Sequence, residues 1–138
     1  MQSSVGSRAF QNARLQKRAR KQAEVLLPTA VKAYREGRHP DAQALCRQIL
    51  QDLPDHFGAL HLLGVSERDC GQYDQAAVVL TRAVEIDPRS AEAQSNLGLS
   101  LLRLGRHEEA RARYERAIAL QPNFPAALTN LGNALTSL

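Results

Sequence analysis

The sequence repeats with a period of 34 residues, and this period constrains the fold more than any other feature. Rows that begin at residues 23, 57, 91 and 125 align without gaps. The recurring residues are Leu63, Leu97 and Leu131 at row position 7; Gly64, Gly98 and Gly132 at position 8; Gly37, Gly71 and Gly105 at position 15; Ala42, Ala76 and Ala110 at position 20; Ile49, Ala83 and Ala117 at position 27; and Pro54, Pro88 and Pro122 at position 32. Such a period predicts stacked units that bury their apolar faces against one another.

Each full row has the pattern of two helices. In the third row we expect a first helix over residues 91–104, ending at Gly105, because glycine commonly follows the last turn of a helix. A second helix is expected over residues 107–120, ending before Pro122, which cannot continue it. The rows therefore predict antiparallel helical hairpins.

Gly98 lies in the middle of a predicted helix, where glycine costs about 1 kcal/mol relative to alanine. We interpret Gly98 and Ala110 as small residues that let two helix backbones approach each other. Leucine at position 98 is then expected to destabilise the fold by overpacking.

These residues resemble the tetratricopeptide repeat family. The resemblance is carried by Leu-Gly at positions 7 and 8, an aromatic residue at position 17 or 24 (Tyr73, Tyr114), alanine at positions 20 and 27, and proline at position 32. It covers residues 23–138 and implies an all-α, right-handed superhelix of about three and a half repeats, to which we add an N-terminal helix. The repeats are expected at 23–56, 57–90 and 91–124, with the first helix of a fourth at 125–138.

Two departures from the family pattern stand out. The usual aromatic residue at position 4 is replaced by Leu26, Leu60, Gln94 and Leu128. Pro28 falls inside the first helix of the first row, where it either begins a shortened helix over 28–36 or kinks a longer one. The first repeat is therefore expected to be degenerate.

The resemblance implies that a concave groove, lined by the first helix of each repeat, binds peptides or helices of partner proteins. The candidate groove residues are Leu27, Val31, His61, Leu62, Val65, Arg68, Ser95, Asn96, Leu99, Leu102, Arg103, Asn130 and Asn133, with Tyr34 and Asp69 at further lining positions. The family's chaperone-binding members hold a chain-terminal carboxylate with lysine, asparagine or arginine, where this chain has Leu27, His61, Leu62 and Glu92. That clamp is therefore expected to be absent.

Asn96 and Asn130 resemble the asparagine ladder of O-GlcNAc transferase repeats, which holds extended peptide backbones. An amide side chain can donate and accept hydrogen bonds together, as a peptide bond requires. Solvated consensus residues are the alternative interpretation. The apolar positions (Leu62, Val65, Leu99 and Leu102) suit a partner helix, or the chain's own N-terminal segment.

The first 22 residues carry a net charge of +6 without an acidic residue, whereas the remainder carries −2. The basic residues are Arg8, Arg14, Lys17, Arg18, Arg20 and Lys21. A weak apolar stripe over residues 14–27 predicts a helix that caps the first repeat. Nucleic acid, an anionic membrane and an acidic protein are possible partners, but the lack of interleaved aromatic residues favours a solvated helix face.

At the other end, Leu131, Leu135 and Leu138 would meet a second helix that this sequence does not contain. Terminal repeats normally carry a polar outer face. We therefore expect that the chain is a piece of a longer protein and that this end associates with another copy.

Cys46 and Cys70 lie in helical patterns with apolar neighbours, which predicts buried, reduced thiols and a cytoplasmic location. The sequence contains neither an 18-residue apolar run nor a signal peptide. The histidines (His39, His56, His61 and His107) lack metal-ligand spacing, so neither a metal, a cofactor nor catalysis is expected.

Three functions remain open. The chain is a peptide-binding scaffold, the substrate-recruiting segment of a larger transferase, or a nucleic-acid-associated adaptor that uses the basic arm. The second is suggested by "ALHLLGV" and "NLGNAL", which resemble repeats of O-GlcNAc-transferase-like glycosyltransferases and of repeat-linked sulfotransferases.

Overall fold

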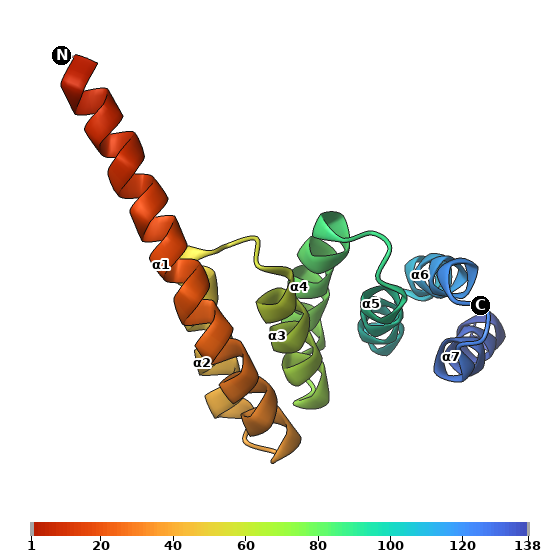
Figure 1. Ribbon diagram of the computed structural model, residues 1–138. Coiled ribbons are helices and arrows are strands. Elements are labelled where there is room, and N and C mark those ends of the chain that lie inside the picture. Colours follow the sequence, from red (N-terminus) through yellow and green to blue (C-terminus); the bar gives the residue numbers. More distant parts are fainter. Residues whose placement is uncertain (1, 138) are drawn as a thin grey trace.

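The computed structural model describes residues 2–137, with side chains from residue 5 onward, and this part of the chain is helical throughout apart from short turns (Figure 1). Its helices are α1 (Gln2–Arg35), α2 (His39–Asp52), α3 (Phe57–Asp69), α4 (Tyr73–Ile86), α5 (Ala91–Arg103), α6 (His107–Leu120) and α7 (Pro125–Thr136). The helices expected in the third row are confirmed, α6 to the residue and α5 with its end one residue earlier.

The helices pair as hairpins, α1 with α2, α3 with α4 and α5 with α6, and α7 packs against α6. The first helices α1, α3, α5 and α7 also contact one another in succession, whereas α2, α4 and α6 do not contact one another within residues 2–137. Because neighbouring hairpins approach most closely on the inside of a curve, the first helices form the concave wall. The predicted all-α stack of hairpins is confirmed.

The turn inside each hairpin depends on a glycine with a left-handed backbone. Gly37, Gly71 and Gly105 have φ angles of 77°, 76° and 78°. This conformation lets the following residue donate to a carbonyl inside the helix, as in the hydrogen bond of 2.9 Å from Arg106 N to Leu101 O. The repeated glycine therefore sets the sharp reversal between the two helices.

The mid-helix glycines make room for a side chain of the second helix. A Cβ atom at Gly64 would lie 2.5 Å from Cγ of Leu80, and one at Gly98 would lie 3.0 Å from the ring of Tyr114. At Gly98 the nearest neighbour is thus the Tyr114 ring of α6. At Gly132 a Cβ would meet no atom within 4 Å.

The N-terminal arm is helical, but it is not the separate capping helix that the sequence suggested. α1 continues from the arm through Pro28, so the shortened helix over 28–36 is wrong and the longer helix is correct. Val5, Phe10 and Leu15 are 70%, 76% and 61% exposed, and Figure 1 shows the arm extending beyond α2. The arm therefore neither caps the first repeat nor fills the groove.

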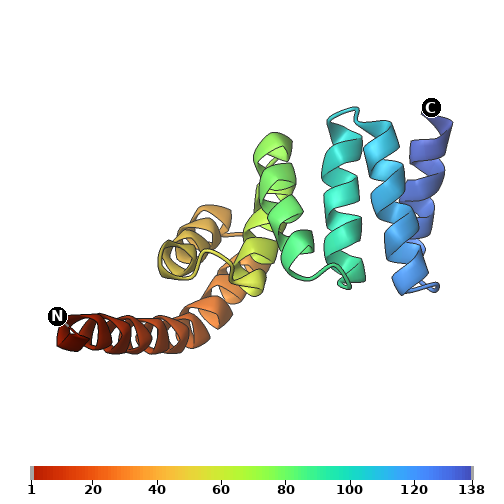
Figure 2. The ribbon, with the colours of Figure 1, turned by 90° about the horizontal axis from the view of Figure 1, so that it is seen from above.

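α1 remains helical through Pro28 because the helix segments before and after the proline pack against the core. Ala23 and Ala30 are buried in a core cluster that includes Cys46 and Ile49 of α2, while Pro28 itself faces solvent. The missing amide of Pro28 removes one backbone hydrogen bond and favours a bend. Figure 2 shows α1 bending between its red and orange parts.

At the C-terminal end, α7 has an incompletely covered apolar face. Leu128 and Leu135 are 48% and 47% exposed, whereas Leu131 packs against the core. Leu138 lies outside the described residues. Self-association through this face therefore stays a prediction.

The two cysteines differ from expectation in one respect. Both are free thiols, but only Cys46 is buried, and Cys70 is exposed at the end of α3. Burial raises the pKa of the Cys46 thiol to about 12. Within residues 2–137, none of the helices has the length and apolar character needed to cross a bilayer.

Candidate functional site

The candidate groove residues lie on α1, α3, α5 and α7, the helices of the concave wall. Their side chains differ in how far they are exposed to a ligand. Ser95 is buried, and Leu27 and Leu62 pack against the core cluster between the first and second hairpins. Arg103 and Asn133 are exposed, and Asn130 is half-buried. The groove therefore offers its polar groups mainly toward α5 and α7.

In the N-terminal half of the groove, polar side chains of three repeats are hydrogen-bonded to one another. The Tyr34 hydroxyl donates to Asp69 at 2.5 Å, and Arg68 pairs with the Asp69 carboxylate at 2.9 Å. Arg68 also donates to Oδ1 of Asn96 at 2.6 Å, and Nδ2 of Asn96 lies 2.8 Å from Nε2 of His61. We call this set of five residues the groove network.

The groove network fixes the protonation of His61. Because Arg68 can only donate, the oxygen of Asn96 must face it, and the amide nitrogen must then donate to His61. His61 can accept this hydrogen bond only in its neutral form. Burial lowers the pKa of His61, assisted by the charge of Arg68 and opposed by that of Glu92. The imidazole is thus neutral near pH 7.

The groove network also limits what Asn96 can offer to a ligand. Its amide oxygen and nitrogen are both engaged by Arg68 and His61, so a peptide backbone would have to share or replace these partners. Of the two asparagines that resemble a ladder, Asn130 is the one outside the groove network.

The C-terminal half of the groove contains a pocket between α5 and α7. It has a volume of about 250 Å³. Its lining consists of Leu99, Leu102, Arg103, His107, Asn130, Asn133 and Ser137. Five of these were predicted as groove residues. His107 and Ser137 were not predicted. His107 begins α6, a second helix, whereas the prediction considered only first helices. Ser137 was left out of the predicted positions of the incomplete fourth row.

The hydroxyl of Tyr114 lies near this pocket. Tyr114 is fully buried, and its Oη atom forms no hydrogen bond with the described residues. Burial raises the pKa of Tyr114, while Arg68, Arg103 and the Asn130 side chain oppose this rise. The ring of Tyr114 covers Gly98.

His107 also has a buried atom without a hydrogen bond within residues 2–137, namely Nδ1. The equivalent residue of the first repeat is His39, whose Nδ1 lies 3.1 Å from Oγ of Ser66. The residue that corresponds to Ser66 beside His107 is Ala134, which is fully buried and has no polar group. The alanine explains the unsatisfied nitrogen.

Replacing Ala134 with serine is therefore expected to stabilise the fold by about 1 kcal/mol, because the new hydroxyl can pair with Nδ1 of His107. Urea denaturation followed by circular dichroism measures the change. The same substitution in a His107→Ala background is the control and should give no gain. A loss of stability in the wild-type background would contradict the repeat equivalence.

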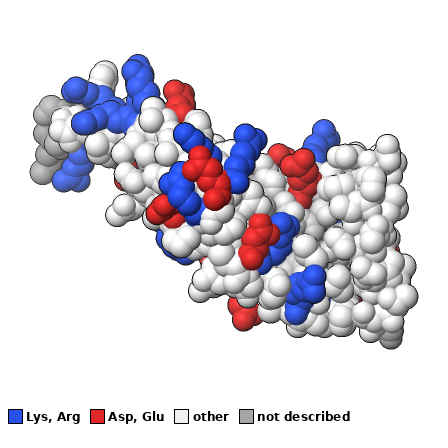
Figure 3. All heavy atoms as spheres, turned by 90° about the horizontal axis from the view of Figure 1, so that it is seen from below, with Lys and Arg blue, Asp and Glu red and all other residues white. Residues whose placement is uncertain are grey.

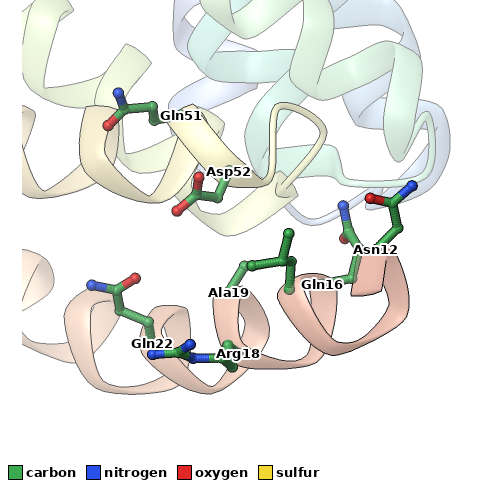
Figure 4. A pocket seen from close by; sticks show the side chains of 8 residues that line it. Asn12, Gln16, Arg18, Ala19, Gln22, Gln51 and Asp52 are labelled. Carbon is green, nitrogen blue, oxygen red and sulfur yellow. The ribbon is translucent and has the colours of Figure 1, made fainter. Parts of the chain in front are cut away.

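Another hollow lies outside the groove, between the arm and the end of α2 (Figure 4). It measures about 700 Å³ and is lined by Asn12, Leu15, Gln16, Arg18, Ala19, Gln22, Gln51 and Asp52. All of these residues except Ala19 are exposed. Long, solvated side chains do not form an ordered binding surface, so this hollow is not the candidate site.

The six cations of the arm remain available to solvent. They form no ion pair with any residue in the described part of the chain, and Figure 3 shows basic side chains gathered at the end of the molecule that the arm forms. The arm is separate from the groove, and its basic character is a property of an exposed helix.

Stacked helical hairpins with one concave wall define the class of α-helical repeat proteins. A family model described as "Tetratricopeptide repeat" matches residues 27–91, 61–123 and 95–138. The chain belongs to the tetratricopeptide repeat family. Among curated protein sequences, none matches it.

Solved structures of similar shape include both enzymes and isolated repeat domains. An O-GlcNAc transferase of Thermobaculum terrenum is 36% identical with a TM-score of 0.80; the match covers 86% of this chain and 23% of that protein. The first repeat domain of Spaghetti (RPAP3), bound to an HSP90 peptide, has a TM-score of 0.82 at 21% identity, covering 85% of this chain and 93% of that one. The second repeat domain of human RPAP3, in complex with an HSP70 peptide, has a TM-score of 0.80 at 19% identity, covering 85% and 98%.

Proposed function

We propose that this chain is a protein-interaction scaffold that binds a peptide segment of a partner protein in the concave groove. The observation that carries the proposal is the pocket between α5 and α7, where amide, guanidinium and leucine side chains converge on the concave wall. Ligand sites combine apolar walls with a few polar groups that fix orientation. The peptide complexes of the two RPAP3 domains support the use of such a groove for peptides.

The two halves of the groove have different roles in this proposal. In the N-terminal half the polar groups already satisfy one another, so the groove network holds successive repeats at a fixed angle. In the C-terminal half the side chains of Asn130 and Asn133 line the pocket, where they can pair with a peptide backbone. The peptide is therefore expected to make its directional contacts over α5 and α7.

A peptide-display selection tests this function. Peptides selected on the wild-type chain should bind it saturably in fluorescence anisotropy, with affinity reduced about tenfold or more in a variant with Asn130 and Asn133 changed to alanine. The matched control changes two exposed amides of α2, Gln48 and Gln51, to alanine. Peptides that bind both variants equally would show that the concave wall is not the recognition surface.

A second candidate function is that the chain is the substrate-recruiting segment of a larger glycosyltransferase. It is favoured by the 36% identity to the O-GlcNAc transferase, of which this chain spans about a quarter. The peptide groove is the same in both candidates, and the gene's downstream sequence distinguishes them.

The free thiols of Cys46 and Cys70 support a reducing compartment such as the cytoplasm.

A further inference from the structure

We propose that the basic arm is a second binding surface, which docks in the major groove of double-stranded DNA and contacts the phosphates on both sides of that groove. The arm is separate from the concave wall, so this inference goes beyond the peptide-binding function and does not depend on it. It is carried by the unpaired charges of the arm, by their distribution around the helix, and by the exposed helical shape of the arm.

The arm concentrates positive charge that the described part of the chain does not neutralise. Residues 1–22 contain six basic residues and no acidic residue. None of the six cations forms an ion pair with a residue between 2 and 137. Asp52 at the end of α2 borders the same hollow as Arg18, but these two side chains are not paired. An anionic partner would balance this charge.

Four of the six cations lie on one face of α1, which we call the basic face. They follow the spacing i, i+3, i+4 and i+7, which brings side chains together on a helix surface. The basic face consists of Arg14, Lys17, Arg18 and Lys21. Like charges at this spacing destabilise a helix, and the first acidic residue of the chain, Glu24, comes after all of them. Phosphate groups bound to the basic face would remove this repulsion.

The basic face points away from the rest of the molecule. Because α1 turns by about 100° per residue, the face lies opposite Ala23 and Ala30, which belong to the core cluster shared with α2. Lys17 and Lys21 border neither of the two hollows between the arm and the end of α2. The back of the helix is therefore next to the protein, and its basic front is accessible to a ligand.

The other two cations lie on the two flanks of the basic face. At about 100° per residue, Arg20 falls on one flank and Arg8 on the other, so the six cations span about two thirds of the helix circumference. A flat membrane surface or a single acidic peptide contacts one side of a helix. The major groove of B-form DNA is about 12 Å wide, admits an α-helix, and has phosphates along both edges. The distribution of the cations therefore favours DNA.

The exposure of the arm also suits a groove. The side chains of residues 5–18 are all exposed, and Figures 1 and 2 show the arm as a single helix that extends beyond the hairpins. The stretch from Arg8 to Lys21 is about 20 Å long at about 1.5 Å per residue, which matches the rise of about six base pairs. A helix of this length can place all six cations along one groove.

The apolar residues of the arm do not form a membrane-binding face. A helix that lies on a bilayer gathers its large apolar residues on one side. At about 100° per residue, Phe10 falls on the opposite side of the arm from Val5 and Leu15. Phe10 is 76% exposed and lies on the basic face, one turn before Arg14. An anionic bilayer is therefore the less suitable partner.

The test is fluorescence anisotropy of a labelled DNA duplex, about two helical turns long, titrated with the full chain. We expect saturable binding with a dissociation constant of about 10 μM or lower at about 50 mM KCl. The logarithm of the binding constant should fall against the logarithm of the KCl concentration with a slope of about −5, as six phosphate contacts would give. An RNA duplex of the same length has a major groove too narrow for a helix and should bind about tenfold more weakly.

Matched variants relate the binding to the arm. Changing Arg14, Arg18 and Lys21 to glutamine should weaken DNA binding about a hundredfold and reduce the magnitude of the slope by about 3. The control changes to glutamine three exposed arginines outside the arm, namely Arg89, Arg111 and Arg116. Both variants lose the same net charge, and the control should bind DNA as the wild type does. Because the arm positions are exposed, the arm variant is expected to fold, and its circular dichroism melting curve verifies this.

The proposal is overturned if the DNA duplex shows no saturable binding, if the RNA duplex binds equally well, or if the arm variant binds DNA as the control does. It is also overturned if phosphatidylglycerol vesicles or a poly-glutamate peptide bind the arm more tightly than DNA at the same KCl concentration. Peptides selected for the groove should bind the arm variant as they bind the wild type, so failure here would leave the scaffold function standing.

Discussion

Changing Gly64 to leucine is expected to lower the free energy of unfolding by about 3 kcal/mol, because the added side chain would occupy the position of Leu80. A Cβ alone would already lie 2.5 Å from Cγ of Leu80, a branching carbon that is fully buried and cannot swing aside. Urea denaturation monitored by circular dichroism measures the loss.

The same repeat position provides the matched control. Gly132 is also inside a helix, but a Cβ there meets no atom within 4 Å, so Gly132→Ala is expected to raise the free energy of unfolding by up to about 1 kcal/mol through helix propensity. Gly64→Ala should lower it. Two shifts of the same sign would show that packing is not the reason for glycine at position 8.

Changing Tyr114 to alanine is expected to cost about 4 kcal/mol, since its fully buried ring fills the space over Gly98 and belongs to the core cluster of α4, α5, α6 and α7. A chemical denaturation curve gives the loss. The cavity cannot close by collapse of Gly98, which has no side chain to move into it.

Tyr114→Phe separates the ring from its hydroxyl. The hydroxyl is buried without a hydrogen bond among the described residues, so its removal should leave stability unchanged or slightly higher. A loss of more than about 1 kcal/mol would reveal a hydrogen bond to Tyr114, with Asn130 as the nearest candidate partner.

The two halves of the groove differ in whether their polar side chains are hydrogen-bonded to one another. His61, Arg68 and Asn96 are tied to one another across two repeats, so their hydrogen bonds maintain the spacing of α3 and α5. Arg103, Asn130 and Asn133 line a pocket and are outside the groove network. A peptide gains most binding free energy where new hydrogen bonds compensate the desolvation of polar groups. We therefore expect its hydrogen bonds over α5 and α7.

Much of the fold could be predicted from local signals in the sequence. Gly105 and Pro122 mark the ends of α5 and α6 because each acts on the backbone of its own neighbours. The positions of the groove residues follow from the same period, since each first helix presents equivalent faces. Pro28 misled the prediction because propensity is a local cost of a few kcal/mol, and burial of Ala23 and Ala30 on either side outweighs it.

The candidate site was less predictable, because side chains of different repeats meet in it. Asn96 and Asn130 occupy the same repeat position, yet only Asn96 is engaged by Arg68 and His61. Likewise His39 finds a hydroxyl at Ser66, whereas His107 meets Ala134. These differences depend on residues about 30 positions apart in the sequence, which no local pattern relates.

The sequence by itself determined that this chain forms stacked helical hairpins, and it placed the ends of α5 and α6 to within one residue, because a strict period repeats the same local signals. The tertiary structure alone decided that the arm continues α1 away from the groove, that Gly98 accommodates the ring of Tyr114, and that Asn96 is engaged by Arg68 and His61. The physical reason is that burial, steric fit and charge pairing are properties of side chains brought together from different repeats, and they exist only once the hairpins have packed.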